Sequence, residues 1–171
     1  MEELPKRKSH RLQGYDYSKN GYYFVTICTE NRKPIFWKTV GADIIRPRNN
    51  NTDFVLSEYG KIIKNAIENI PEHYDGVFVD RYCIMPNHVH LIVAITSKEN
   101  GRIISAPTLS RIIGQMKHWA TKQCGFSVWQ KSFYDEIIRN QTAYDEISKY
   151  IYENPMNWEL DELFINNFIN N

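Results

Sequence analysis

Residues 81–95 read R-Y-C-I-M-P-N-H-V-H-L-I-V-A-I, and the second half of this stretch predicts a buried strand. From His88 onward β-branched and aliphatic residues dominate, and Pro86 lacks the N–H that a sheet ladder requires, so the strand begins after it. Side chains alternate between the two faces of a strand, so His88 and His90 project from the same face, about 7 Å apart along the chain. Two neutral imidazoles at this spacing suit one metal ion.

Two histidines on one strand also have a simpler interpretation, in which both rings are core residues with hydrogen-bond partners inside the protein. A lone histidine in a strand is more often of this kind than a metal ligand. Two on one face, flanked by aliphatic residues, would both lose their hydration without an evident partner in the sequence, which favours the metal pair. The opposite face of the strand is apolar and is predicted to be core: Val89, Leu91, Val93 and Ile95.

The size and composition of the chain predict a single domain over residues 1–171, with a basic N-terminal arm in residues 1–20 and a tail in residues 159–171. No apolar run reaches the roughly 18 residues of a membrane span, and the N-terminus lacks the apolar core of a signal peptide. The cysteines form no C-x-x-C pair, which is typical of a reducing compartment. We therefore expect a cytoplasmic protein without membrane contact.

The formal net charge is only +1, but the charges are unevenly distributed along the chain. Basic residues dominate residues 98–131, whereas acidic residues dominate residues 132–171. The N-terminal arm is basic as well, and it supplies three candidate phosphate contacts: Arg7, Lys8 and Arg11. This asymmetry permits a face that binds a polyanion despite the nearly neutral total.

Hydrophobic periodicity and turn residues predict alternating strands and helices. Strands are expected at residues 22–28, 77–85, 88–95 and 133–138, with weaker candidates at residues 35–40 and 54–56. Helices are expected at residues 58–69, at residues 108–124, and from a cap at Asn140 or Thr142 to Asn154. Pro71 and Pro155 are expected to end the first and third helices.

The order of these elements is strand, helix, two strands, helix, strand and a last helix. The two-residue break at Pro86-Asn87 favours an antiparallel hairpin, because a parallel partner needs a long crossover. This is the split βαββαβ order of ferredoxin-like folds. We therefore expect an α+β fold, with an antiparallel sheet, helices on one face and the other face free for a ligand.

The second predicted helix carries two opposed stripes. Its apolar stripe is expected to face the core: Ile112, Met116, Trp119 and Ala120. Its polar stripe has residues spaced by four, three and four: Arg111, Gln115, His118 and Lys122. A polar stripe is usually a solvated face and less often meets phosphate, so its three basic members are candidate DNA contacts.

The third predicted helix places Tyr150 and Asn154 one turn apart, whereas Tyr152 points nearly the opposite way. A tyrosine with its ordinary pKa of about 10 is a weak nucleophile at neutral pH, so a divalent metal would assist by polarising a phosphate. Asn154 could supply an oxygen ligand beside the two imidazoles. The alternative is that Tyr150 is an amphipathic edge residue and Asn154 a helix cap. The remaining stripe is predicted to be buried: Tyr144, Ile147 and Ile151.

Four blocks of sequence resemble one family of DNA-processing enzymes. M-P-N-H-V-H at 85–90 resembles the His–hydrophobic–His motif of HUH single-strand endonucleases. The other blocks are R-L-Q-G-Y-D-Y-S-K-N-G-Y-Y-F-V-T-I-C-T-E-N-R (11–32), V-W-Q-K-S-F-Y-D-E-I-I-R-N (128–140) and K-Y-I-Y-E-N-P-M-N-W (149–158). Together they resemble the REP-associated tyrosine transposases, relatives of the IS200-like single-tyrosine transposases.

The resemblance implies a ferredoxin-like domain that cuts and rejoins single-stranded DNA. In its terms His88, His90 and Asn154 hold Mg²⁺ or Mn²⁺, and Tyr150 attacks a phosphodiester. The attack forms a 5′-phosphotyrosyl link and releases a 3′-OH, and a later attack by a 3′-OH reverses it. The implied cofactor is therefore the metal ion alone.

The resemblance also implies a partner, namely single-stranded DNA beside a hairpin in repetitive extragenic palindromes. A monomer or a homodimer would bind it, associated with the nucleoid. Aromatic side chains stack on unpaired bases, and the candidates for this contact are Tyr15, Tyr17, Trp129 and Tyr134, with core packing the alternative for Trp129. The segment 41–53 is longer than the family leads us to expect.

Two other functions fit parts of the same sequence. A βαββαβ domain can be a non-catalytic single-stranded nucleic-acid-binding module, with aromatic residues on its exposed sheet face. Alternatively, Cys83 could join His88 and His90 in a zinc site, although free cysteines in strands are mostly buried small hydrophobic residues.

Overall fold

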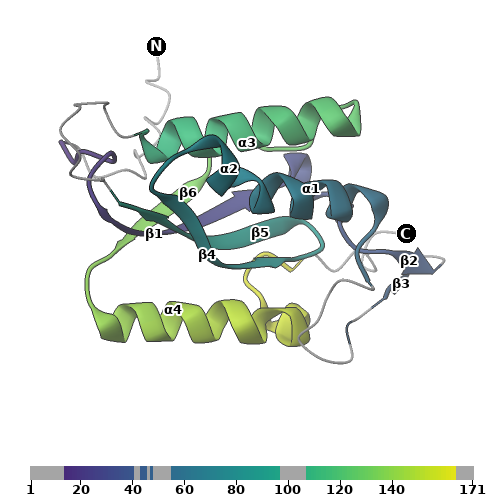
Figure 1. Ribbon diagram of the computed structural model, residues 1–171. Helices are drawn as coiled ribbons and strands as arrows, with labels where there is room; N and C mark the ends of the chain where they lie inside the picture. Colours follow the sequence, from purple (N-terminus) through teal and green to yellow (C-terminus); the bar gives the residue numbers. More distant parts are fainter. Residues whose placement is uncertain (1–13, 41–42, 46, 48–54, 97–106, 165–171) are drawn as a thin grey trace, which may run out of the picture.

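One antiparallel sheet organises the protein, with strand order β4-β5-β1-β6. The computed structural model describes residues 14–40, 43–45, 47, 55–96 and 107–164 (Figure 1). The strands of this sheet are β1 (Gly21–Cys28), β4 (Val77–Ile84), β5 (His88–Ile95) and β6 (Tyr134–Ile138). The helices are α1 (Glu58–Glu68), α2 (Ile70–His73), α3 (Leu109–Cys124) and α4 (Gln141–Glu153), with 3₁₀ segments at Glu30–Arg32 (η1) and Asn154–Leu160 (η2). The antiparallel α+β sheet predicted from the sequence is confirmed.

The two central strands, β5 and β1, carry the residues on which the rest is built. Every residue of β5 is buried, because a strand between two neighbours with helices on both faces has no solvated side. The register pairs Cys28 with His88 and Thr26 with His90 across β1 and β5. On the other side of β1, Thr26 pairs with Tyr134 of β6. Residues from three strands therefore line up across the sheet at His90.

Helices cover both faces of the sheet (Figure 1). α1, α2 and α3 lie on one face, where Ser57 and Thr108 cap α1 and α3 and Gly125 ends α3 at φ 78°. α4 crosses the opposite face, with its N-terminus capped by Asn140. That face was expected to be free for a ligand, and this expectation was wrong, because the short link after β6 turns the chain back across the sheet. No helix among the described residues is both long and apolar enough to cross a membrane.

Several predicted boundaries differ from the structure. Residues 35–40 form no continuous strand: Trp37 pairs with Leu56 in an isolated bridge, and a short hairpin joins β2 (Thr39–Val40) to β3 (Asp43–Ile44). Phe54, residues 48–53 and most of the 97–107 loop lie outside the described part of the chain.

Proline acts differently from the prediction at two helix ends. Pro71 was expected to stop the first helix, but α1 ends at Glu68 and Pro71 lies in the first turn of α2, where its missing N–H costs nothing. Pro155 was expected to push Asn154 out of helical geometry, but Asn154 has φ −55° and ψ −44°. The chain therefore continues into η2 without a break in direction.

Gly60 is required by packing, although helix propensity alone makes it a weak point of α1. A Cβ at this position would lie 2.2 Å from the carbonyl oxygen of Phe36. That carbonyl accepts the Ser57 N–H, so the segment before α1 is held against the first turn of the helix. The glycine allows this close approach.

We expect Gly60→Ala to lower the free energy of unfolding by roughly 1–3 kcal/mol, since the backbone of Phe36 would have to move. Gly114→Ala in α3 is the matched control, because a Cβ there meets nothing within 4 Å. That substitution should stabilise the protein by up to about 1 kcal/mol through helix propensity. Urea unfolding of both variants tests the pair, and a stabilised Gly60→Ala variant would contradict the packing argument.

Candidate metal and tyrosine site

β5 presents two histidine side chains to the face covered by α4. The Nε2 atoms of His88 and His90 lie 2.9 Å apart. A side-chain oxygen engages each Nδ1, with Asn87 Oδ1 at 2.7 Å from His88 and Thr26 Oγ1 at 2.8 Å from His90. Because both Nδ1 atoms are occupied in this way, both Nε2 atoms turn toward one point. The prediction that the two histidines share a face is confirmed.

α4 brings the Tyr150 hydroxyl to the same point. Its oxygen lies 3.1 Å from Nε2 of His90, and the two rings are in edge-to-face contact. Phe24 of β1 stacks on the His90 ring, with centroids 5.4 Å apart, and contacts the Tyr150 ring edge-on. Tyr150 nevertheless remains 42% exposed, so a ligand can reach its hydroxyl.

The C-terminal segment adds a carboxylate that sequence reasoning missed. After η2, Asp161 turns inward, and its Oδ2 accepts hydrogen bonds from the Tyr150 hydroxyl at 3.2 Å and the Asn154 amide at 2.8 Å. Its Oδ1 accepts the Leu163 N–H at 2.7 Å. Asp161 Oδ2 also lies 3.7 Å from His88 Nε2 and 3.9 Å from His90 Nε2.

Asp161 carries no local signal, because it stands in an acidic, irregular tail in which any carboxylate reads as solvated. Trp158, three residues before it, is buried and contacts the His88 ring with centroids 6.0 Å apart. The residue directly before Asp161, Leu160, is 83% exposed. At this turn the leucine side chain is therefore exposed and the Asp161 carboxylate is buried.

The stripe on α4 is less buried than predicted. Ile151 is buried, but Tyr144 and Ile147 are half-buried. The Tyr144 hydroxyl donates to Asp80 at 2.5 Å, so Tyr144 lies at the polar edge of the interface between α4 and β4. Tyr152 is 62% exposed and points away from the histidines, as expected.

The electrostatics of the site keep the histidines neutral and the carboxylate charged. Burial lowers the pKa of both imidazoles, and for His88 the neighbouring His90 lowers it further. Burial raises the pKa of Asp161, but the two histidines, the Asn154 amide and the Leu163 N–H outweigh it and hold that pKa below its usual value. Burial and then the Asp161 charge raise the pKa of Tyr150, so its phenol is protonated near neutral pH.

These groups fit a divalent metal ion. The ligand atoms of His88, His90 and Asp161 all lie within 4.8 Å of one another. Two adjacent ligands of an ion with bonds of about 2.1 Å are roughly 3.0 Å apart, close to the observed separation of the two Nε2 atoms. Neutral imidazoles and a carboxylate together suit first-row divalent ions such as Mn²⁺. Cys83 is outside this group, and burial strongly raises the pKa of its thiol, which does not favour the zinc alternative.

A cleft of about 780 Å³ opens beside the Tyr150 hydroxyl. Its floor comes from β1 and β6 and one wall from the C-terminal segment that carries Asp161. Tyr134, one of the stacking candidates, lines this cleft and is 45% exposed. Trp129, another candidate, is buried in the core, in agreement with its alternative assignment.

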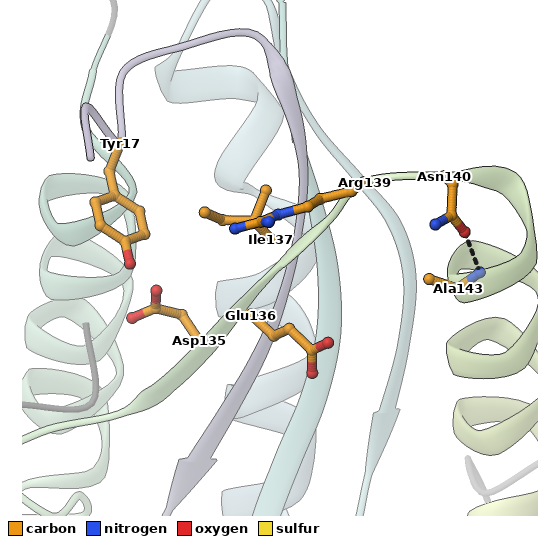
Figure 2. A pocket seen from close by; sticks show the side chains of 7 residues that line it. All are labelled: Tyr17, Asp135, Glu136, Ile137, Arg139, Asn140 and Ala143. Carbon is orange, nitrogen blue, oxygen red and sulfur yellow. Dashed lines mark hydrogen bonds between the residues drawn. The ribbon is translucent and has the colours of Figure 1, made fainter. Parts of the chain in front are cut away.

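The other candidate DNA contacts that the structure describes lie away from the histidines. Arg7, Lys8 and Arg11 fall outside the described residues. The polar stripe of α3 is exposed as expected, on the opposite side of the sheet from α4: Arg111, Gln115, His118 and Lys122. Tyr15 and Tyr17 contact each other edge-on. Tyr17 also lines a separate hollow of about 400 Å³, where Figure 2 shows its hydroxyl directed toward Asp135.

Sequence comparisons match this chain to one family model and to two Haemophilus influenzae proteins. The family model described as Transposase IS200 like matches residues 17–154. An uncharacterized Haemophilus influenzae protein is 32% identical over 178 residues, covering 93% of this chain and 93% of its own. Another H. influenzae protein, named as a REP-associated tyrosine transposase, is 24% identical over 152 residues, covering 82% of this chain and 73% of its own.

A solved structure shares the fold. It is that of a REP-associated tyrosine transposase bound to a REP hairpin, and it superposes with a TM-score of 0.58 at 20% sequence identity. The superposition covers 89% of this chain and 76% of that one.

We expect acid to destabilise the metal-free protein, beginning below the unfolded-state histidine pKa of 6.5. Because the folded pKa values are lower, the unfolded chain binds more protons in this window, and the free energy of unfolding falls as the pH falls. Asp161 adds a loss of the same sign only below its unfolded value of 3.8. Urea unfolding in EDTA, at about pH 7.5 and about pH 5.5, measures the first effect.

The controls for this experiment are two histidine variants. His90→Gln should flatten the dependence on pH, whereas His73→Gln, at an exposed position on α2, should leave it unchanged. A stability that is the same at both pH values in the unmodified protein would contradict the neutral, buried state of the pair.

Proposed function

The chain belongs to the IS200-like transposase family, and on this premise we propose that it is a metal-dependent enzyme that cuts and rejoins single-stranded DNA through Tyr150. The observation that carries the proposal is the convergence of four side chains from distant parts of the chain. The Tyr150 hydroxyl lies 3.1 Å from the Nε2 of His90, which in turn lies 2.9 Å from the Nε2 of His88. Asp161 faces all three groups.

We propose that strand cleavage is a single displacement at phosphorus. The Tyr150 oxygen forms a bond to the scissile phosphorus while the bond from phosphorus to the 3′ oxygen breaks. The phenol proton is released to water, and the departing 3′ oxygen takes a proton from water to become a 3′-OH, so the protons balance. Asp161 accepts the phenol hydrogen bond and orients the hydroxyl before attack. A divalent ion held by the histidines would withdraw charge from the phosphate and orient it.

Rejoining is the reverse displacement. A 3′-OH attacks the phosphotyrosyl bond, and Tyr150 leaves with its proton restored. Because the phosphotyrosyl link retains the energy of the broken phosphodiester, no nucleotide cofactor is needed. The proposed intermediate is a 5′-phosphotyrosyl link, which is stable enough to be trapped on the denatured protein.

The proposed substrate is single-stranded DNA next to a hairpin. Support comes from the family and from the relative solved with a REP hairpin. Within this chain, Tyr134 supports it as an exposed aromatic ring in the cleft beside Tyr150. Stacking of an unpaired base on such a ring contributes about 1–3 kcal/mol and does not require one particular base.

We expect Tyr150→Phe to abolish a covalent protein–DNA band that the unmodified protein forms with single-stranded hairpin oligonucleotides and Mn²⁺. Denaturing gels separate this band, and EDTA should remove it as well. Tyr152→Phe is the matched control, because that neighbouring phenol is 62% exposed and faces away, so its band should persist. Salt-sensitive DNA binding without any band would instead favour the non-catalytic binding module, and a band that survives in Tyr150→Phe would reassign the nucleophile.

The sequence and the structure suggest different third donors for the metal. Asn154 was expected to offer an oxygen, and its amide N–H donates to Asp161. We propose Asp161, whose ligand atom lies within 4.8 Å of those of both histidines, as the third ligand, with Asn154 orienting it.

If this assignment holds, Asn154→Ala should weaken Mn²⁺ binding about 10-fold, as is usual for a residue behind a ligand, and Asp161→Asn should weaken it more. Titration of Mn²⁺ followed by electron paramagnetic resonance measures both dissociation constants. The reverse ranking would restore Asn154 as the ligand.

A further inference from the structure

Asn87 lies between the histidine pair and the C-terminal segment and contacts both. Its side chain is 1% exposed. Oδ1 lies 2.7 Å from Nδ1 of His88, and Nδ2 donates to the backbone oxygen of Leu163 at 2.9 Å. Its own backbone oxygen accepts from the N–H of Thr29 at 2.8 Å and from the Thr29 hydroxyl at 3.0 Å. The residue is therefore held at both its backbone and its side chain.

These contacts determine which nitrogen of His88 carries the proton. The Leu163 carbonyl only accepts hydrogen bonds, so the NH₂ group of Asn87 must face it and the amide oxygen must face His88. An amide oxygen also only accepts, so Nδ1 of His88 must be the N–H donor. The neutral ring then has its lone pair on Nε2, which points at His90 and Asp161.

The same amide holds the turn that carries Asp161. The backbone of Leu163 is bound at both ends, with its N–H on Asp161 Oδ1 and its oxygen on the Asn87 amide. The turn is far from Asn87 in the sequence, since the hydrogen bond between Asn87 and Leu163 joins residues 76 positions apart. One buried side chain thus orients a histidine and anchors the segment with the carboxylate.

We propose that Asn87 is a positioning residue that couples the tautomer of His88 to the docking of the C-terminal segment, so that two of the three metal ligands are set by one amide. This rests on the metal site of the proposed function. Thr26 lacks the second role: its hydroxyl contacts Nδ1 of His90, can donate or accept, and makes no hydrogen bond to the described residues around Asp161.

The discriminating variant is Asn87→Asp, which keeps an acceptor for the Nδ1–H of His88 but removes the donor to Leu163. Two measurements on the full chain follow its effects. Mn²⁺ affinity comes from electron paramagnetic resonance, and docking of the segment comes from a glutamate-specific protease that cuts after the exposed Glu162 and releases the terminal peptide. Thr26→Val is the matched control for a contact to a histidine alone.

We expect Asn87→Asp to release the peptide at least several-fold faster and to weaken Mn²⁺ binding about 10-fold. In an Asp161→Asn background it should cause no further loss of affinity, because its effect acts through that ligand. Thr26→Val should weaken Mn²⁺ binding without changing the release of the peptide. Asn87→Ala, which introduces no buried charge, gives a second double-mutant cycle with Asp161→Asn. The loss of Mn²⁺ affinity that it causes should be smaller in the Asp161→Asn background than in the unmodified protein.

Three results would overturn the inference: unchanged peptide release in both Asn87 variants, an undiminished loss of affinity in the Asp161→Asn background, or tighter Mn²⁺ binding after the segment is released. Neither measurement uses DNA. If the protein binds Mn²⁺ as expected but forms no DNA adduct, the proposed reaction is contradicted and the role of Asn87 stands. If the unmodified protein binds no Mn²⁺, both proposals are contradicted.

Discussion

Two imidazole rings are buried in the middle of an apolar sheet, and each of their ring nitrogens requires a partner. Burying such groups unpaired would cost several kcal/mol, so the surrounding structure is arranged to satisfy them. Asn87 and Thr26 engage the two outer nitrogens, while Tyr150 and Asp161 approach the two inner ones. Most of the polar contacts at the centre of the fold follow from this requirement.

The resulting site is assembled from segments that are distant in the chain. β5 and β1 form its rigid floor through a continuous ladder, α4 crosses above them, and the segment after η2 closes the remaining side. A floor of paired strands holds the histidines more firmly than the loop-like segment holds its carboxylate, because the segment has few backbone partners. The histidine pair is thus the fixed half of the site, and the carboxylate is the half that depends on docking.

The same surroundings set the protonation state of Tyr150. Burial and the nearby carboxylate disfavour the phenolate of Tyr150, so this tyrosine is less reactive at rest than an exposed one. A positive charge bound at the Nε2 atoms of the two histidines would favour the phenolate and so oppose both effects. Under the proposed mechanism, such a site would couple the reactivity of the tyrosine to the binding of the metal ion and the DNA.

Local pattern was sufficient for the strand that carries His88 and His90 and for the helix that places Tyr150 and Asn154 one turn apart, because alternation and helical spacing act between near neighbours. It narrowed the cap of that helix to Asn140 or Thr142, and the structure shows Asn140. Tertiary structure alone decided that α4 covers the second face of the sheet, that Gly60 is a packing requirement, and that Asn87 and Asp161 belong to the site. The hydrogen bond between Asn87 and Leu163 joins positions 76 residues apart, and no periodicity in a sequence encodes such a contact. Asp161 has the sequence context of a solvated acid, and only the tertiary structure places its carboxylate beside the histidines.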